Sequence, residues 1–512
     1  MTHQIVVILD FGSQYTQLIA KQVRRLNIYC EILPCTVSIE EIYSKNPQAI
    51  ILSGSPFSTT NPDAPKVDAS IFDGNIPVLS ICYGMQLMVS SLGGKVDNFE
   101  KKEFGYARIK IDDHSTIFKG LDQEETVWMS HGDSVSLLPQ GFKCLAHTEN
   151  SPYAAIAHTD KPLFALQFHP EVVHTVNGAR VIENFLTNIC SFSKDWTSES
   201  FIESAIKQTQ TLVGNDQVIL GLSGGVDSSV VAALLYKAIG QNLIPIFVNT
   251  GLLRKNEVKE VQHFFENEFG MQLITIDAEN LFLTKLENIT DPEQKRKIIG
   301  NTFIEVFDNE AKKYPNAKWL AQGTLYPDVI ESVSFKGPSA TIKSHHNVGG
   351  LPEKMQLRLI EPLRELFKDE VRAVGRELGL PEHMVDRHPF PGPGLAIRIL
   401  SDITKEKVKI LQDIDAIFIE ELRNNNLYHK VWQAFAVLLP VYSVGVMGDE
   451  RTYEQLCGLR AVTSVDGMTA DWADLPYDFL KRVSNRIINE VRGVNRVVYD
   501  ISSKPPATIE WE

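Results

Sequence analysis

The sequence predicts an α/β protein: two doubly wound α/β domains followed by a smaller α+β C-terminal domain. Short apolar runs alternate with amphipathic segments over residues 4–95, the pattern of a largely parallel sheet with helices between its strands. The same alternation restarts with QVILGLSGG at residue 217. Beyond the proline- and glycine-rich run HPFPGPG at 388–394, helix-like and strand-like segments are mixed. These observations favour two similar layered domains and a different third one.

The length supports the same division. A chain of 512 residues is too long for one ordinary core and corresponds to about three domains. The polar stretch SFSKDWTSES at 191–200 is the first candidate linker, and HPFPGPG marks the second boundary. We therefore expect domains at residues 1–195, 196–390 and 391–512.

The composition indicates a soluble enzyme that acts on small anions. Asp and Glu total 64 against 50 Lys and Arg, without a basic tract long enough to follow a nucleic-acid backbone. We expect no nucleic-acid partner. The six cysteines show no metal-ligand spacing and are too sparse for a disulfide framework, which suits the cytoplasm. The first residues lack a secretion signal, and the longest uncharged run, 431–448, is interpreted as buried core, so no membrane partner is expected.

The stretch PVLSICYGMQLM predicts a cysteine nucleophile. A strand meets a helix at Cys82, with Gly84 two residues later, as in a nucleophile elbow. The helix N-terminus lowers a thiol pKa from ~8.5 toward neutrality and offers an N–H to an oxyanion. His169 in QFHPEV is the candidate base, and Glu171 is placed to orient its ring. A lone buried Cys or His is more often structural, so the prediction depends on the combination.

In this order and spacing, ICYGMQ and HPE resemble the class I glutamine amidotransferases over about residues 4–190. The resemblance implies hydrolysis of glutamine through a glutamyl thioester on Cys82, with release of ammonia. Ser55 and Ser80 depart from the family pattern at positions where glycines are usual, which bears on the oxyanion geometry. The candidate oxyanion and glutamine-binding residues are Gly54, Tyr83 and Gln86.

The stretch ILGLSGGVDSSVVA, 219–232, predicts a phosphate site without the lysine of a kinase P-loop. Backbone N–H groups and serine hydroxyls at a helix N-terminus cradle phosphates, and Asp227 is a candidate ligand for Mg²⁺. A plain Gly–Gly turn with a serine cap is the alternative. The motif resembles the ATP pyrophosphatases, which cleave ATP between its α and β phosphates and adenylate a substrate oxygen. The candidate ATP-binding residues are Ser223, Gly224, Gly225, Val226, Asp227, Ser228, Ser229, Lys343 and Lys368.

The two predicted chemistries are halves of one amination. Adenylation makes a carbonyl oxygen a leaving group, and glutamine-derived ammonia is the nucleophile that replaces it. The order of the two halves, with stretches such as AQGTLYPDVIES and the terminal KPPATIEWE, resembles the glutamine-hydrolysing GMP synthetase family over essentially the whole chain. This implies amination of XMP at C2 to give GMP, with glutamine and ATP as the other substrates, and a homodimer formed through the C-terminal domain. The candidate XMP-binding residues are Arg296, Arg496, Lys504, Ile509 and Glu510.

Four alternatives compete with this interpretation. Glutamine-dependent NAD synthetase joins a similar loop to a different amidase, and asparagine synthetase uses an N-terminal cysteine, whereas Thr2 follows Met1 here. CTP synthetase carries a kinase-type P-loop. A catalytically inactive nucleotide sensor would have lost its nucleophile or loop, yet Cys82, His169, Glu171 and Asp227 are all present. The sequence therefore favours an enzyme.

Overall fold

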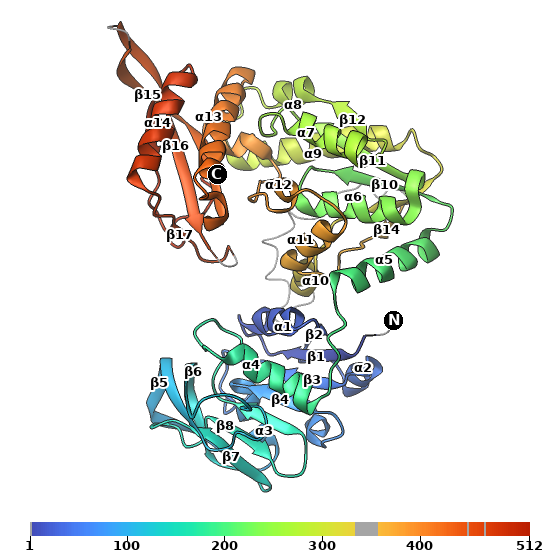
Figure 1. The fold of residues 1–512 in the computed structure, drawn as a ribbon, viewed down its shortest axis with the longest axis vertical. Helices are drawn as coiled ribbons and strands as arrows, with labels where there is room; N and C mark the ends of the chain where they lie inside the picture. The colour runs from blue at the N-terminus through green and yellow to red at the C-terminus, as the bar shows by residue number, and fades with distance from the viewer. Residues whose placement is uncertain (1–2, 333–356, 448–449, 465–466) are drawn as a thin grey trace. The chain divides into compact units, whose positions relative to one another are not determined.

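The computed structural model describes residues 3–332, 357–447, 450–464 and 467–512. These form two compact units (Figure 1). The amino-terminal unit contains residues up to 204 with 325–332 and 365–367. The carboxy-terminal unit contains 205–324, 357–364 and 368 onward. Each unit has its own sheets and cores and is described separately.

A nine-stranded sheet, in the order β2-β1-β3-β4-β9-β8-β7-β5-β6, forms the centre of the amino-terminal unit. Five of its strands are parallel neighbours: β1 (Ile5–Asp10), β2 (Tyr29–Pro34), β3 (Ala49–Leu52), β4 (Val78–Ile81) and β9 (Leu163–Leu166). The others pair antiparallel: β5 (Lys95–Ile111), β6 (Glu124–Leu137), β7 (Phe142–His147) and β8 (Ala155–His158). The parallel part therefore ends at β9, where the chain returns beside β4.

Helices cover both faces of this sheet. Because side chains alternate along a strand, Val6 and Ile8 of β1 enter one core, whereas Val7 and Leu9 enter another. The first core also contains residues of α1 (Thr16–Arg25) and α4 (Gly178–Glu183), and a π-helical segment, Asn184–Ile189, continues α4. The second contains residues of α2 (Ile39–Ser44), α3 (Tyr83–Ser91) and a 3₁₀ turn at Ala69–Phe72. The parallel part of the unit is thus doubly wound.

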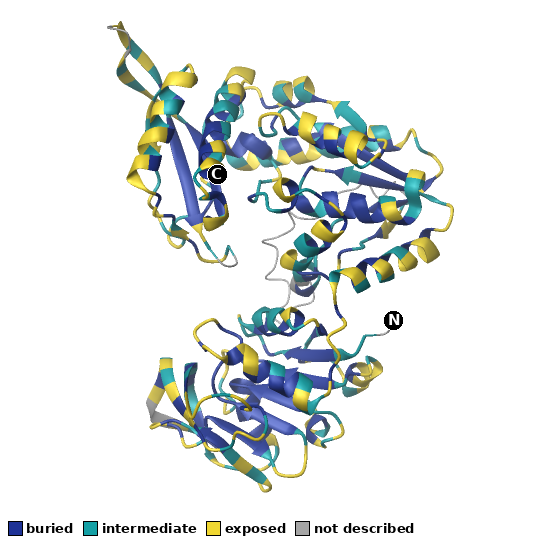
Figure 2. Ribbon diagram, viewed as in Figure 1, coloured by how far each residue is buried: buried dark blue, intermediate teal, exposed yellow. Residues whose placement is uncertain are grey.

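The carboxy-terminal unit has a second parallel sheet, in the order β12-β11-β10-β13-β14. Its strands are β10 (Gln217–Leu222), β11 (Leu243–Asn249), β12 (Ile274–Asp277), β13 (Ala317–Ala321) and β14 (Arg358–Ile360). Its connecting helices are α6 (Val226–Ile239), α7 (Glu257–Gln262), α8 (Glu279–Lys285), α9 (Pro292–Ala311), α11 (Lys368–Glu377) and α12 (Glu382–Val385). Figure 2 shows its central strands as buried, as expected where helices cover both faces of a parallel sheet.

The last part of this unit is built differently. Two long strands, β15 (Gln433–Met447) and β16 (Glu450–Thr463), pair antiparallel. β16 also pairs with the short antiparallel β17 (Asp471–Trp472) and with the parallel β18 (Val494–Tyr499). Helices α13 (Lys405–Asn424) and α14 (Tyr477–Glu490) pack against this sheet. Thr404 begins α13 because its hydroxyl accepts a hydrogen bond from the N–H of Lys407.

Two helices lie near the boundary between the units in sequence. The first, α5, runs from Ser198 to Val213, and the second, α10, from Tyr326 to Ser332. The hydroxyl of Tyr326 accepts a 2.5 Å hydrogen bond from the N–H of Ile32, which ties α10 to β2 in the amino-terminal unit. A segment more than two hundred residues downstream thus completes the core of this unit.

The predicted fold class is confirmed: two doubly wound parts and a mixed carboxy-terminal part. The division at 195 and 390 stays a prediction. Within the described ranges, no helix combines the length and apolar character that a membrane crossing requires.

Candidate active sites

Cys82 occupies the sharp turn between β4 and α3. Its backbone has φ 53° and ψ −104°, a positive φ that residues with a Cβ rarely adopt. Its N–H donates to the carbonyl of Leu166 at 2.7 Å. Gly84 permits the close approach of α3 to β3, since a Cβ there would lie 2.8 Å from the Cβ of Leu52. Such a turn presents the thiol at a helix N-terminus, the geometry of a nucleophile elbow.

His169 and Glu171 form a buried pair directly after β9. Nδ1 of His169 lies 2.7 Å from Oε1 of Glu171, and Thr175 donates its hydroxyl to the carbonyl of His169 at 2.6 Å. Burial lowers the pKa of His169, but the negative charge of Glu171 and the sulfur of Cys82 outweigh it and raise that pKa well above 6.5. The structure thus brings Cys82, His169 and Glu171 together around one imidazole.

Gly54, the candidate second oxyanion donor, lies close to this imidazole. A Cβ on Gly54 would be 3.2 Å from Cε1 of His169. The adjacent Ser55 turns its hydroxyl away to donate to the carbonyl of Phe11 at 2.8 Å. Ser80 is fully buried on β4, and its hydroxyl has no partner among the described residues. The two serines therefore fit inside the fold without displacing the turn at Cys82.

Tyr83 and Gln86, on the first turns of α3, are both engaged with the protein. The Tyr83 hydroxyl donates to the carbonyl of Pro65, and burial raises its pKa to about 12. The Gln86 side chain donates to the carbonyl of Asp133 at 2.8 Å. These contacts hold α3 against its neighbours, and the assignment of both residues to glutamine binding stays a prediction.

The structure adds residues around the thiol that the sequence analysis did not assign. Nε2 of Gln167 and the carbonyl of Ser130 each lie 3.8 Å from Sγ of Cys82. Next to Ser130, His131 is buried with its Nε2 3.2 Å from Oε2 of Glu103. Gln167 stands inside the motif QFHPEV and could have been noticed there. The Glu103–His131 pair has no sequence signal, because only strands β5 and β6 bring it together.

The predicted phosphate loop joins β10 to α6. Gly224 has φ +73°, and Gly225 is the N-cap of the 14-residue helix α6. The hydroxyls of Ser223 and Ser228 lie 3.0 Å apart, and the Ser228 hydroxyl donates to the carbonyl of Gly225 at 3.1 Å. Ser229 is buried, with a hydroxyl that has no partner among the described residues. Val226 opens the helix, so the loop offers N–H groups and hydroxyls at a helix N-terminus.

Asp227 and Lys368 meet beside this loop. Nζ of Lys368, at the start of α11, lies 2.6 and 2.7 Å from the two carboxylate oxygens of Asp227. Both side chains are partly exposed, so a triphosphate could compete for the lysine. Lys343 lies outside the described residues.

The donor set at the loop fits a magnesium ion only together with phosphate oxygens. Among the described residues, no cluster of three or more His, Cys, Asp or Glu side chains could hold a metal ion alone. Mg²⁺ in nucleotide sites is commonly held by one or two carboxylates plus phosphates, and Asp227 is such a carboxylate. Its two oxygens are occupied by Lys368 here, so binding the ion requires that pair to open.

Glu510, in the C-terminal tail, accepts hydrogen bonds from two buried side chains. Its carboxylate accepts from Nε and Nη2 of Arg398 at 3.1 and 2.8 Å, and from Gln433 at 2.7 Å. Ile509 is buried against Phe435 and its neighbours in a small apolar core. Glu510 is therefore fixed on both sides, by an ion pair and by the packing of Ile509.

The remaining candidates for XMP binding are spread more widely. Arg296 donates to the backbone carbonyl of Glu512 at 2.7 Å, and Lys504 donates to the carbonyl of Gly467 at 2.8 Å. Arg496 is exposed on β18. The structure brings Arg296 to the end of the tail.

Three family descriptions match successive parts of this chain. They are "Glutamine amidotransferase class-I" over residues 7–189, "NAD synthase" over 197–302 and "GMP synthase C terminal domain" over 420–511. Proteins named "GMP synthase [glutamine-hydrolyzing]" match nearly the full length. The one from Brachyspira hyodysenteriae is 61% identical over 507 residues, covering 99% of both chains. Those from Fusobacterium nucleatum and Vibrio vulnificus are 59% and 57% identical, again over 99% of each chain.

The chain belongs to the glutamine-hydrolysing GMP synthase family. The predicted resemblance is thereby confirmed, and NAD synthetase, the alternative that shares the SGG-type loop, is set aside by the full-length matches. In this member of the GMP synthase family, the cysteine and histidine motifs follow β4 and β9 of the first sheet, and the phosphate loop follows β10 of the second. Within each sheet, parallel strands direct the loops that follow them to the carboxyl edge.

Several polar residues of this GMP synthase family member were missed by the sequence analysis. Arg398 and Gln433 hold Glu510, and Arg387 contacts the phosphate loop. Arg387 lies directly before HPFPGPG, and Arg398 lies four residues after it, beside a motif that the sequence analysis used as a domain boundary. The position of these two arginines beside the motif was the sequence signal that could have indicated a role for them.

Proposed function

We propose that this chain makes GMP from XMP, using ATP to activate the purine and glutamine as the source of nitrogen. The observation that carries the proposal is the match over 99% of its length to proteins named for this activity. The arrangement of Cys82, His169 and Glu171 supports the glutamine half, and the loop at Ser223–Ser229 supports the ATP half.

In the glutamine half, Cys82 is the nucleophile. His169 takes the thiol proton and passes it to the departing ammonia, while Glu171 holds the imidazole in the tautomer that this transfer needs. The sulfur attacks the side-chain amide carbon of glutamine, and ammonia leaves as the thioester forms. The N–H groups that follow Cys82 and Gly54 stabilise the oxyanion. Water then releases glutamate. The short His169–Glu171 contact and their burial support these roles.

In the ATP half, the loop residues hold the triphosphate and the oxygen on C2 of XMP attacks the α-phosphate. Pyrophosphate leaves, ammonia adds at C2, and AMP departs. Bound Mg²⁺ would neutralise charge on the pyrophosphate, and Asp227 is the residue that would hold it. Lys368 is proposed to exchange Asp227 for a phosphate when ATP binds, which its partial exposure permits. Lys343 is proposed to act on the same phosphates.

Arg296, Arg496, Lys504, Ile509 and Glu510 are proposed to surround XMP. We assign the cationic side chains to its phosphate and Glu510 to the purine ring. The fixed position of Glu510 between Arg398 and Gln433 supports a recognition role, because a preorganised carboxylate loses little entropy on binding. Tyr83 and Gln86 are proposed, with Gly54, to complete the glutamine site.

We further propose a homodimer formed through the C-terminal domain, residues 391–512, and a location in the cytoplasm. Apolar side chains are exposed along β15 and β16, among them Tyr442, Val446 and Tyr453, which supports an interface there. None of the cysteines is in a disulfide, which fits a reducing compartment. Sedimentation of the purified chain and of Val446→Lys, which should be monomeric, tests the dimer.

A steady-state assay tests the proposed activity. Formation of AMP and GMP is followed from XMP with ATP and Mg²⁺, first with glutamine and then with ammonium as nitrogen source. We expect one AMP per GMP with both. Glutamine hydrolysis without any XMP-dependent AMP formation would contradict the proposal.

A further inference from the structure

Arg387 lies against the backbone of the phosphate loop. Its Nη1 donates to the carbonyl of Gly224, and its Nη2 lies 2.5 Å from Oε1 of Glu257. We propose that Arg387 is a positioning residue for ATP: it fixes the orientation of the peptide between Gly224 and Gly225. The proposal goes beyond the proposed function and relies on it only for the identity of the ligand.

The geometry of a trans peptide explains how this contact acts on phosphate. The C=O and N–H of one peptide unit point in opposite directions. Because Arg387 holds the carbonyl of Gly224, the N–H of Gly225 faces the other side, where it lies 3.3 Å from the Ser223 hydroxyl. That side also carries the Ser228 hydroxyl.

Two glycines in a row make this peptide easy to turn over. Without a Cβ on either residue, the barrier to rotating the plane is low. A turned plane would direct the carbonyl oxygen of Gly224 at an anionic phosphate in place of an N–H, and so exchange attraction for repulsion. An arginine that binds the carbonyl from behind prevents this.

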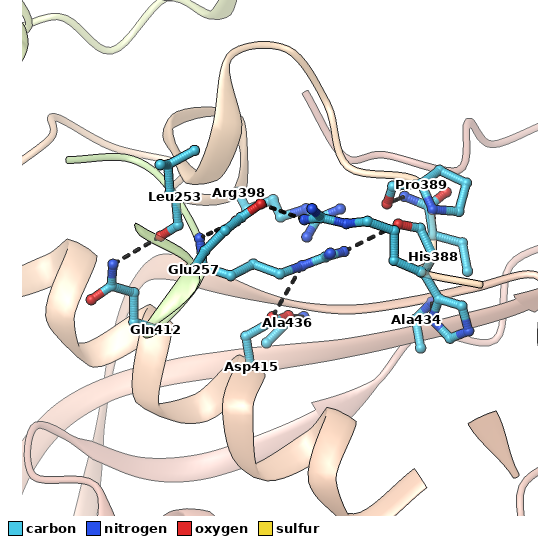
Figure 3. A network of polar contacts seen from close by, with 12 residues as sticks. Leu253, Glu257, His388, Pro389, Arg398, Gln412, Asp415, Ala434 and Ala436 are labelled. Carbon is cyan, nitrogen blue, oxygen red and sulfur yellow. Dashed lines mark hydrogen bonds and ion pairs between the residues drawn. The ribbon is translucent and has the colours of Figure 1, made fainter. Parts of the chain in front are cut away.

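Glu257 holds the guanidinium in its place. It is buried at the first position of α7, and its second carboxylate oxygen accepts from the N–H of Arg254 at 3.0 Å. Arg254 in turn faces Asp415 of α13, which also accepts from the N–H of Ala436, and Gln412 donates to the carbonyl of Leu253 (Figure 3). Rigid elements of the carboxy-terminal unit therefore support Arg387.

The backbone around Arg387 is also held in place by side chains of other segments. Its carbonyl accepts from Arg372 of α11, the helix that begins at Lys368, at 3.4 Å. The next residue, His388, is buried and bonded to Tyr428. Arg372 and Tyr428 therefore hold the backbone at residues 387 and 388, which leaves the guanidinium little freedom.

A direct contact between Arg387 and phosphate is the alternative. The side chains of Arg387 and Glu257 are only 13% and 6% exposed, and the carboxylate neutralises the arginine. A buried, neutralised guanidinium that already binds a loop carbonyl is suited to positioning rather than to attracting a triphosphate. The variant Arg387→Lys separates the two roles: lysine can replace arginine as a direct phosphate contact but not as a bridge between the carbonyl and the carboxylate.

The test compares Arg387→Gln, Arg387→Lys and Glu257→Gln with the unchanged chain. The probe is an ATP analogue with a methylene group between its α and β phosphorus atoms. It is titrated into each protein in the presence of Mg²⁺, and calorimetry measures its affinity. We expect Arg387→Gln to weaken binding on the order of tenfold or more, and Glu257→Gln to weaken it in the same direction. Arg387→Lys should recover only part, because one ammonium cannot reach the carbonyl and carboxylate in the fork geometry of a guanidinium.

Turnover gives a second measurement. In Arg387→Gln, kcat for AMP formation should fall and KM for ATP should rise, while KM for XMP stays unchanged; a general loss of structure would change both KM values. Arg180→Gln is the matched control, because the half-exposed Arg180 pairs with Glu183 at 3.1 Å in the amino-terminal unit. Circular dichroism and thermal unfolding confirm folding, and if Arg387→Gln fails to fold, Arg387→Lys and Glu257→Gln decide the result.

Two outcomes would overturn the proposal. One is analogue affinity and kcat in Arg387→Gln equal to those of the unchanged chain. The other is full recovery by Arg387→Lys together with no effect of Glu257→Gln, which would make Arg387 a direct phosphate contact. If the unchanged chain forms no AMP from XMP, the proposed function fails, yet the binding measurements still decide the role of Arg387.

Discussion

Cys82 combines a positive φ with an imidazole partner, and both features follow from its position between β4 and α3. The turn costs of order 1–3 kcal/mol of backbone strain, which the surrounding structure must offset. Such strain at a solvent-shielded thiol is a common property of catalytic sites. It supports a role for this residue in chemistry rather than in packing.

The first prediction at the residue scale concerns Cys82→Ala. Thioester formation needs the sulfur, whereas amination of the adenylate needs only ammonia. The variant should therefore lose glutamine-dependent GMP formation and keep the ammonium-dependent reaction largely intact, measured as steady-state rates with each nitrogen source. Cys190→Ala is the control, because Cys190, partly buried at the end of the helical segment Asn184–Ile189, belongs to neither motif and should leave both rates unchanged. Glutamine-dependent synthesis by Cys82→Ala would remove the thiol from the mechanism.

The second prediction concerns Asp227, whose carboxylate is now paired with Lys368. If it holds Mg²⁺ against the leaving pyrophosphate, Asp227→Ala should lower the rate of adenylation by at least ~100-fold. Both nitrogen sources should be affected alike, since adenylation precedes the use of ammonia. Asp369→Ala serves as the control, because Asp369 follows Lys368 in sequence at the start of α11. Near-normal ammonium-dependent turnover of Asp227→Ala at saturating Mg²⁺ would show that the metal is held by other groups.

At the scale of elements, the segment HPFPGPG is joined to β15 through its first residue, a neutral histidine. His388 stacks on Tyr428 with ring centroids 3.9 Å apart. Its Nδ1 accepts from the N–H of Ala434 at 3.2 Å, and its Nε2 donates to the carbonyl of Tyr428 at 2.9 Å. One accepting and one donating nitrogen define a neutral imidazole. Burial, opposed only in part by the bond to Tyr428, lowers its pKa from 6.5 to about 4.

The third prediction is a stability difference that depends on pH. Because the folded pKa of His388 lies below its unfolded value of 6.5, the unfolded chain binds a proton first as pH falls. This group's contribution to stability is complete above pH 6.5 and is lost between 6.5 and about 4. Between pH 7 and 4.5, the unchanged chain should lose about 2 kcal/mol more of its unfolding free energy than His388→Gln.

Urea unfolding followed by tryptophan fluorescence at both pH values measures this difference. His383→Gln is the matched control, because His383 is exposed nearby on α12 and should behave like the unchanged chain. An equal loss of stability in His388→Gln and in the unchanged chain would show that His388 is not held neutral.

At the scale of the whole molecule, the end of the chain closes against distant segments of the carboxy-terminal unit. The Glu512 carboxylate lies 2.7 Å from Nζ of the buried Lys295, and Glu510 binds Arg398. Glu510→Ala is therefore a poor probe of XMP binding, because it leaves a buried guanidinium unpaired, a change that typically costs 3–5 kcal/mol. Lys504, whose ammonium donates to one loop carbonyl within the described residues, is the better probe.

The fourth prediction follows for Lys504→Ala. If its ammonium binds the phosphate of XMP, the variant should lose on the order of 1–3 kcal/mol of affinity for XMP, measured by calorimetry. Glutamine hydrolysis measured without XMP and ATP should be unchanged, since Cys82 belongs to the other unit. Lys481→Ala, on the surface of α14, provides the control. Unchanged XMP affinity in Lys504→Ala would mean that this part of the tail is structural.

Local patterns alone were enough to predict much of this protein. The alternation of apolar and amphipathic segments predicted both doubly wound parts, because a strand or helix must present its apolar residues at a fixed period to be buried. Motifs contiguous in sequence predicted the turn at Cys82, the His169–Glu171 pair and the loop at 223–229, because each depends on backbone geometry within a few residues. At these turns, few other residue types fit, because Gly84 has no room for a Cβ and Gly224 has a positive φ.

Contacts between distant segments could be decided only by the tertiary structure. Arg387 meets Gly224, Glu510 meets Arg398, and Glu103 meets His131 across long separations in sequence. A lone arginine or glutamate is most often a solvated surface group, so its residue type carries almost no information about its partner. Burial makes these pairs necessary, since an unpaired charge inside the protein is costly, and only the packing of sheets and helices determines which charges are buried together.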